Sequence, residues 1–476
     1  MAFALLSRLH RRPALTVAIA TAVVSMTGLT AWAIVTNLTL VDALHDPQAE
    51  HADQGKLVAL VASGQAHEAF EEAFELGDEL FATQFNALDG VGADCGHGQR
   101  FTRVPRADVP EWMNQTPSRE TGPNAETCVA CHSSPFEDGA SGAAGNVHRD
   151  PTYSGSLGSF IQRNTPHLFG LGGTQRLAEE MTAELQREVS RVKHQACSTG
   201  QPVTAVLDAK GVKFGSITAT PSGTPCDAVL DTSAVEGIAA DLVVRPFQWK
   251  GSVAFIRDFN RGAAHNELGM QGVELTGADV DGDGDGVANE LTIGDLTSLA
   301  VYNAAQPRPT TKQELASLGL IPPLAPGESA AIDAGRATFS SIACASCHVP
   351  SLTVMDPIFH EPSLSPAYRD ATFPSGVDPV SQGVSPNLAI TFDITQDQPD
   401  NQIRDASGSV TFHLGSFKTD TLGHAIVEVF GDLKRHEMGS GLAESIDEVG
   451  TGASVFLTRN LWGVGSTAPY LHDGRA

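Results

Sequence analysis

A five-residue pattern occurs twice in this chain, and it restricts the possible structures more than any other part of the sequence. Cys128-Val129-Ala130-Cys131-His132 and Cys344-Ala345-Ser346-Cys347-His348 both read C-x-x-C-H. This spacing is the attachment signature of c-type haem. The two thiols can bond both vinyl groups of one porphyrin, and the adjacent imidazole can then bind the iron. We therefore predict two covalently bound haem c groups, with His132 and His348 as iron ligands.

A C-x-x-C pair can also form a disulfide, a zinc site or a redox-active dithiol. A zinc ribbon needs two such pairs brought together. Here the pairs lie in different halves of the chain, and each has its own histidine. The repetition of the complete pattern favours haem at both positions.

Residues 1–37 have the pattern of an export segment. Arg8, Arg11 and Arg12 precede Pro13–Val35, an apolar run without charge, and Ala31-Trp32-Ala33 matches a cleavage signal. The apolar run is also long enough to remain as a membrane anchor. We expect the rest of the chain to be in the periplasm, either released or anchored to the inner membrane.

Export favours disulfides, and three cysteines lie outside the two motifs. Cys197 and Cys226 are close in sequence, and a bridge between them would close a loop of about 30 residues and contribute about 3–4 kcal/mol. Cys95 would then remain a thiol. The other two pairings stay open at this point.

The charge of the chain limits its partners. Its 30 Lys and Arg against 56 Asp and Glu give a formal net charge of −26. This excludes nucleic acid, because affinity for nucleic acid comes largely from cationic side chains. An acidic surface favours a basic electron-donor protein, although it also suits a saline habitat.

Hydrophobic periodicity predicts helices and short strands between loops rich in Gly and Pro. Helices are expected at 46–90, Thr174–Lys193 and Ser329–Ile342. Strands are expected at Val203–Leu207, Val212–Thr220, Ala239–Val244, Leu388–Phe392 and Ser409–Leu414. We therefore expect a mainly α-helical, loop-rich fold with a small β-rich insert at about 196–256.

The stretch Pro322–Glu328 is rich in Pro and Gly and is the best candidate for a domain boundary. Because one haem motif lies on each side of it, we expect two cytochrome-c-like haem domains in tandem, at 46–325 and 326–476.

The segment Asp279–Glu290 predicts a calcium site. Its alternating carboxylates, its glycines and its closing glutamate match the loop D-x-D-x-D-G-x₅-E, with Gly286 where an apolar residue is usual. The expected ligands are Asp279, Asp281, Asp283, Asp285 and Glu290. An alternative register starts at Asp281 and uses Asp283, Asp285 and Asn289.

Several further segments, together with the two haem motifs, resemble one family. They are Phe85-Asn86, Asp89–Gly92, Gly98–Phe101, Arg163–Gly172, Arg261–Met270, His436–Gly439, Leu461–Gly463 and Leu471–Ala476. From about Phe81 onward the chain is similar to the bacterial dihaem oxidoreductases, which are related to the dihaem cytochrome c peroxidases and to the enzyme that matures tryptophylquinone. In that family a further helix follows the His-Asp-Gly-Arg-Ala stretch, so we expect a C-terminal piece of the second haem domain to be missing.

The resemblance implies an enzyme with a peroxidase-like activity. An external donor, such as a small cytochrome, would reduce one haem, and the second haem would reduce peroxide. Two alternatives remain: a non-enzymatic dihaem electron carrier, and haem-dependent oxidation of a protein partner.

The sixth iron ligands decide the mechanism, because a haem with an open position can bind peroxide. The candidates are His167, His265, Met270, His436, Met438 and His472. We expect His167 near the first iron, and Met438, beside a Gly-Ser-Gly stretch, as a ligand of the second.

Peroxide cleavage also needs a group that transfers a proton. The candidate carboxylates are Glu179, Glu180 and Glu267. Arg100, Arg103 and Arg106 are candidates for pairing with haem propionates. Trp249 or Trp462 could lie between the haems, although packing is the commoner role of a buried tryptophan.

Overall fold

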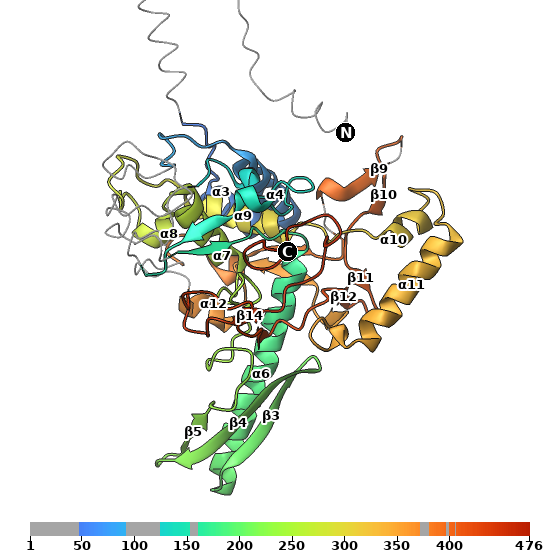
Figure 1. Ribbon diagram of the computed structural model, residues 1–476. Helices are drawn as coiled ribbons and strands as arrows, with labels where there is room; N and C mark the ends of the chain where they lie inside the picture. Colours follow the sequence, from blue (N-terminus) through green and yellow to red (C-terminus); the bar gives the residue numbers. More distant parts are fainter. Residues whose placement is uncertain (1–46, 92–123, 153–159, 372–379, 397–398, 405) are drawn as a thin grey trace, which may run out of the picture. The chain divides into compact units, whose positions relative to one another are not determined.

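The structure is a computed structural model that describes residues 47–91, 124–152, 160–371, 380–396, 399–404 and 406–476 (Figure 1). The predicted export segment, Cys95, Arg100, Arg103 and Arg106 lie outside the described residues. In the described part of the chain, no helix has both the length and the apolar character needed to cross a membrane.

The expected fold class is wrong. The chain is 33% helix and 17% strand, and the strands form many small sheets, so it is not the mainly helical, tandem cytochrome-like structure that we expected. Most strands have only two to four residues, because glycines and prolines interrupt the chain at short intervals.

The helical layer around residue 300 forms the most buried part of the structure. Helix α9 (Ile293–Ala304) is buried along its whole length and begins with a capping box between Thr292 and Asp295. Helix α4 (Ala66–Ala82) packs closely on α9: a Cβ added at Gly77 would lie 2.3 Å from the carbonyl oxygen of Ser298. The predicted helix over 46–90 is therefore two helices, α3 (Gln54–Ala62) and α4, separated by a short turn.

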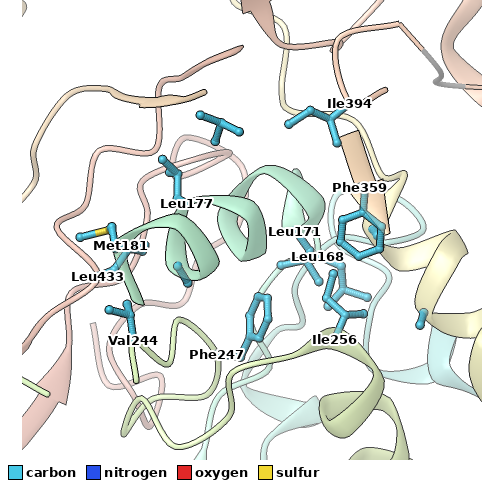
Figure 2. Close-up of a cluster of buried hydrophobic side chains, with 14 of the residues drawn as sticks. Leu168, Leu171, Leu177, Met181, Val244, Phe247, Ile256, Phe359, Ile394 and Leu433 are labelled. Carbon is cyan, nitrogen blue, oxygen red and sulfur yellow. The ribbon is translucent and has the colours of Figure 1, made fainter. Parts of the chain in front are cut away.

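The longest helix is α6 (Leu171–Thr199), which extends the predicted Thr174–Lys193 helix at both ends. Its apolar face enters a cluster of buried side chains (Figure 2). In Figure 2, Leu177 and Met181 of α6 lie in the same cluster as Ile256 and Phe359, which come from opposite sides of the Pro322–Glu328 linker. Residues 47–476 accordingly form one compact unit by their contacts.

The β-rich insert is a three-stranded antiparallel sheet in the order β3-β4-β5, and it packs along the C-terminal part of α6 (Figure 1). Strands β3 (Val203–Ala209) and β4 (Val212–Ser222) confirm two predictions, and the Cys197–Cys226 disulfide is confirmed as well. The third strand is β5 (Asp227–Asp231), not Ala239–Val244.

Apart from α11, the remaining helices and strands are short. The helices are α7 (Ile256–Ala263), the π-helical turn Ala264–Leu268, α8 (Val273–Thr276), α10 (Lys312–Ser317), α11 (Pro326–Ser341) and α12 (Pro366–Ala371). The antiparallel pairs are β1 (Val147–Arg149) with β2 (Ile161–Arg163), β7 (Ile358–Glu361) with β8 (Ile390–Asp393), β9 (Gln402–Arg404) with β10 (Val410–His413), and β13 (Arg435–Glu437) with β14 (Val455–Leu457). Strands β11 (Lys418–Thr419), β12 (Ala425–Val427) and β6 (Leu352–Val354) form a second three-stranded sheet. Helix α11 and strands β8 and β10 lie where the sequence predicted them, within a few residues.

Candidate functional site

The two C-x-x-C-H motifs have the same local structure. Each begins with a 3₁₀ turn, Cys128–Ala130 or Cys344–Ser346, and none of the four cysteines forms a disulfide. The backbone N–H of His132 donates to the carbonyl oxygen of Cys128 at 3.0 Å, and that of His348 donates to Cys344 at 2.9 Å. The turn therefore brings the two thiols and the imidazole of each motif together.

The imidazole rings of the two motifs are also held in the same way. Nδ1 of His132 lies 3.1 Å from the carbonyl oxygen of Gly139, and Nδ1 of His348 lies 2.9 Å from that of Phe430. A carbonyl oxygen only accepts, so Nδ1 carries the proton and Nε2 of the neutral ring carries the lone pair. The backbone of Pro166 also lies near the His132 ring. This is the tautomer and the outer hydrogen bond that metal-binding histidines usually have.

Each motif lines its own cavity. The first cavity has a volume of about 150 Å³ and is lined by Cys128, Cys131 and His132 together with apolar side chains, among them Phe81 and Phe259. Burial lowers the pKa of His132 to about 4 and raises the pKa of the Cys128 thiol to about 12. A neutral imidazole suits iron binding, and a protonated thiol argues against a reactive dithiol.

The second cavity has a volume of about 500 Å³, within the usual range for small-molecule sites. Cys344, Cys347 and His348 lie on its wall. The other lining residues include Phe456, Leu457, Leu461, Trp462 and several polar side chains discussed below. A mostly apolar wall beside two thiols and a correctly oriented imidazole fits a tetrapyrrole. The first cavity offers the same set of donors in a volume below that range.

The two cavities adjoin each other. The segment Asn164–Pro166 and the side chain of Trp249 line both. Trp249 is fixed in this shared wall because its indole N–H donates to the carbonyl oxygen of Asn164 at 2.8 Å. Groups bound in the two cavities would therefore be separated by one layer of protein that contains an aromatic ring.

The structure places His167 differently from our expectation. It lines the cavity of the second motif, not the first, and it is buried. Its Nδ1 accepts a hydrogen bond from the backbone N–H of Phe169 at 3.2 Å, so the neutral ring carries its proton on Nε2. Burial, reinforced by the nearby charge of Arg459, lowers the pKa of His167 to about 3. In this tautomer His167 is a hydrogen-bond donor and not an iron ligand.

Three other candidate ligands line the second cavity. Met438, half exposed, does so together with His436 and His472. Nε2 of His436 is 2.7 Å from the buried carboxylate of Asp432, and the ring of His472 stacks on Phe456. His265 and Met270, also candidates, are buried but are not among the residues that line either cavity.

Of the candidate carboxylates, only Glu267 lines a cavity. It belongs to the π-helical turn beside the first motif, and the side-chain amide of Asn124 donates to its carboxylate. Glu180 instead accepts from Lys210 at 2.5 Å and from the backbone N–H groups of Met355 and Asp356. Glu180 therefore contacts the loop that follows β6 and lines neither cavity, so the geometry does not support a catalytic role for it. Glu179 likewise lines neither cavity and accepts from Ser363.

Sequence reasoning missed several charged residues of the cavities. Arg149 and Arg163, in the β1–β2 hairpin, line the first cavity, and both pair with Glu448. Arg459 lines the second cavity and lies directly before the Leu461-Trp462-Gly463 segment. This position beside the Leu461-Trp462-Gly463 segment was the only sequence feature that could have identified Arg459 as a cavity residue.

The predicted calcium loop brings together three of its five carboxylates. Those of Asp281, Asp283 and Asp285 converge, with one oxygen of each lying within 4.8 Å of the others. Asp279 instead accepts from Asn289, and Glu290 is buried and accepts from the backbone N–H of Gln271 at 2.7 Å. The three converging carboxylates belong to both predicted registers, and Asn289 of the alternative register donates to Asp279.

No protein-family model, curated protein or solved structure matches this chain.

Proposed function

We propose that this chain is a periplasmic dihaem c-type oxidoreductase with peroxidase-like activity, and a member of the bacterial dihaem oxidoreductases that it resembles. The observation that carries this proposal is the placement of both motifs. Each C-x-x-C-H triplet lines its own cavity with the imidazole Nε2 available, and the two cavities share a wall.

The haems, when bound, would supply one-electron redox chemistry and an iron position that binds peroxide. The chain would supply the rest. His132 and His348 would hold the two irons, apolar walls would exclude water, and Trp249 would occupy the layer between the cavities. A donor protein would provide two electrons, and with two protons these would convert one peroxide into two waters.

Each cavity contains one group that could transfer the proton. Glu267 lines the first cavity, and His167, with its proton on Nε2, lines the second. Only one haem needs to react with peroxide. Substituting each of these two residues in turn therefore tests which cavity holds the haem that reacts.

We expect one of the two variants Glu267→Gln and His167→Gln to lower peroxide turnover about 100-fold or more, and the other to leave it close to wild type. Haem content should be equal in all three proteins. The matched control is Glu179→Gln, since Glu179 lines neither cavity. Peroxide turnover that is absent from haem-loaded wild type would refute the peroxidase-like activity.

A second candidate function is electron transfer without catalysis. Met438 and His436 line the second cavity, and either could complete the coordination of an iron there. An absorption spectrum after addition of one electron equivalent separates the two functions. One high-spin haem supports the enzyme, whereas two low-spin haems in every redox state support the carrier.

A further inference from the structure

Arg459 is partly buried, and its surroundings differ from those of every fully buried arginine in the described chain. It follows β14, lines the second cavity, and its guanidinium carbon lies 5.3 Å from the centre of the Trp249 ring. The residue is partly buried and forms part of the cavity wall. Its positive charge is therefore presented to whatever occupies that cavity.

Within the described residues, Arg459 has no carboxylate at ion-pair distance and no side-chain hydrogen bond. The fully buried arginines of the described chain all have an acidic partner: Arg163 with Glu444, Arg176 with Glu179, Arg257 and Arg261 with Glu274, and Arg308 with Glu314. Burial without a counter-charge lowers the pKa of Arg459 to about 10. A buried charge is normally paired, because leaving water without a partner is costly.

The next residue supplies a second polar group of the same cavity. Oδ1 of Asn460 is buried beside His167 and makes no hydrogen bond of normal geometry. Together with the Nε2 proton of His167, this gives the wall a cation, a donor and an acceptor next to one another. An apolar ligand would leave the guanidinium of Arg459 without a hydrogen-bond acceptor.

We propose that Arg459 binds a carboxylate in the second cavity. The proposal rests on the proposed function, since the obvious carboxylate is a propionate of a tetrapyrrole attached at Cys344 and Cys347. A guanidinium is well suited to this partner because it can donate two parallel hydrogen bonds. A free carboxylate that enters the cavity would satisfy the same chemistry, and the experiment below separates the two sources.

The test is a redox titration of the full haem-loaded chain, followed by absorbance, for wild type, Arg459→Gln and Arg459→Lys. Removing a positive charge near one haem should stabilise its oxidised form. In Arg459→Gln we expect one of the two haem transitions to move to a lower potential. At a fixed potential the ratio of reduced to oxidised haem should fall about tenfold for that transition, which corresponds to about 59 mV for one electron. Arg459→Lys should retain most of the wild-type potential. Arg191→Gln, which removes an exposed cation of α6, is the matched control and should shift neither transition.

Added acetate identifies the source of the carboxylate. If the carboxylate belongs to the tetrapyrrole, acetate leaves both wild-type midpoints unchanged. If it is a free ligand, acetate lowers one wild-type midpoint saturably and has no effect in Arg459→Gln. Midpoints of Arg459→Gln that equal those of wild type would overturn the proposal.

The proposed function can fail separately. Wild-type protein without covalent haem would refute the dihaem assignment, and acetate binding to that haem-free chain, measured by calorimetry, would then decide the role of Arg459. Binding by wild type that is lost in Arg459→Gln would support an anion site. An absence of binding to either protein would overturn it.

Discussion

The tautomers of three histidines that line the cavities distinguish the roles of otherwise similar rings. Nδ1 of His132 and Nδ1 of His348 face carbonyl oxygens, whereas Nδ1 of His167 accepts from a backbone N–H. The first two rings are therefore prepared for metal binding through Nε2, and the third is prepared to donate a hydrogen bond. The C-x-x-C-H pattern predicted the first two, because it is local. The tautomer of His167 depends on the turn to Phe169 and could not be predicted from sequence.

The depressed pKa of His167 predicts an acid-sensitive stability. Its pKa is about 3 in the folded chain, against an ordinary value of 6.5. Between these two pH values the ring binds a proton in the unfolded chain but not in the folded chain. The stability that the neutral ring provides is present above pH 6.5 and is lost as the pH falls toward 3. Between pH 6 and 4, urea unfolding should show wild type losing about 1.4 kcal/mol more per pH unit than His167→Gln. Parallel pH profiles of the two proteins would contradict this.

Among the secondary-structure elements, the insert shows where sequence patterns succeed and fail. Alternation of apolar and polar residues predicted β3 and β4. The closeness of Cys197 and Cys226 in sequence favoured their disulfide. Ala239–Val244 looked like a strand because it is apolar. The backbone of Leu242 has a φ of 57°, in the left-handed region, which is incompatible with a regular strand. The segment is therefore an irregular loop, and its side chains Leu242 and Val244 are buried in the core.

The acidic loop after α8 is the element for which we predict calcium binding. Three convergent carboxylates repel one another unless a cation lies between them. A ligand that binds only the folded chain, at 100 times its dissociation constant, stabilises it by about 2.7 kcal/mol.

We therefore expect EDTA to lower the melting temperature of wild type by a few degrees, and calcium to restore it. Asp283→Asn should melt at the lower temperature with or without EDTA, whereas Asp333→Asn, on the exposed side of α11, should respond to EDTA as wild type does. A wild-type melting curve that EDTA leaves unchanged would count against the site.

A buried ion pair joins the two segments, 46–325 and 326–476, that the sequence predicted to be separate domains. The guanidinium of Arg257 donates to Glu274 at 2.6 Å and to Glu361 at 2.8 Å, and Tyr368 donates to Glu361 at 3.1 Å. Glu274 also accepts from Arg261. The Arg257–Glu361 pair connects segments on opposite sides of the Pro322–Glu328 linker. Such long-range pairing, like the meeting of Trp249 and Arg459 in the cavity wall, could not be deduced from one sequence.

Removing the shared carboxylate of this cluster should be costly. Glu274→Gln leaves two buried guanidinium groups with too little negative charge, and breaking a buried pair in this way typically costs about 3–5 kcal/mol. Equilibrium urea unfolding measures the loss. The control is Glu328→Gln, which breaks the exposed pair with Lys312 and should change the free energy of unfolding little. Equal stabilities for the two variants would show that this buried cluster contributes little to the free energy of unfolding.

The central claim is that each C-x-x-C-H motif attaches one haem in its own cavity. Intact mass spectrometry of the full chain, expressed with export and haem attachment, tests it most directly. We predict two covalent haem adducts on wild type and one on each of the double variants Cys128→Ala/Cys131→Ala and Cys344→Ala/Cys347→Ala. Wild-type protein that carries one adduct or none would contradict the account.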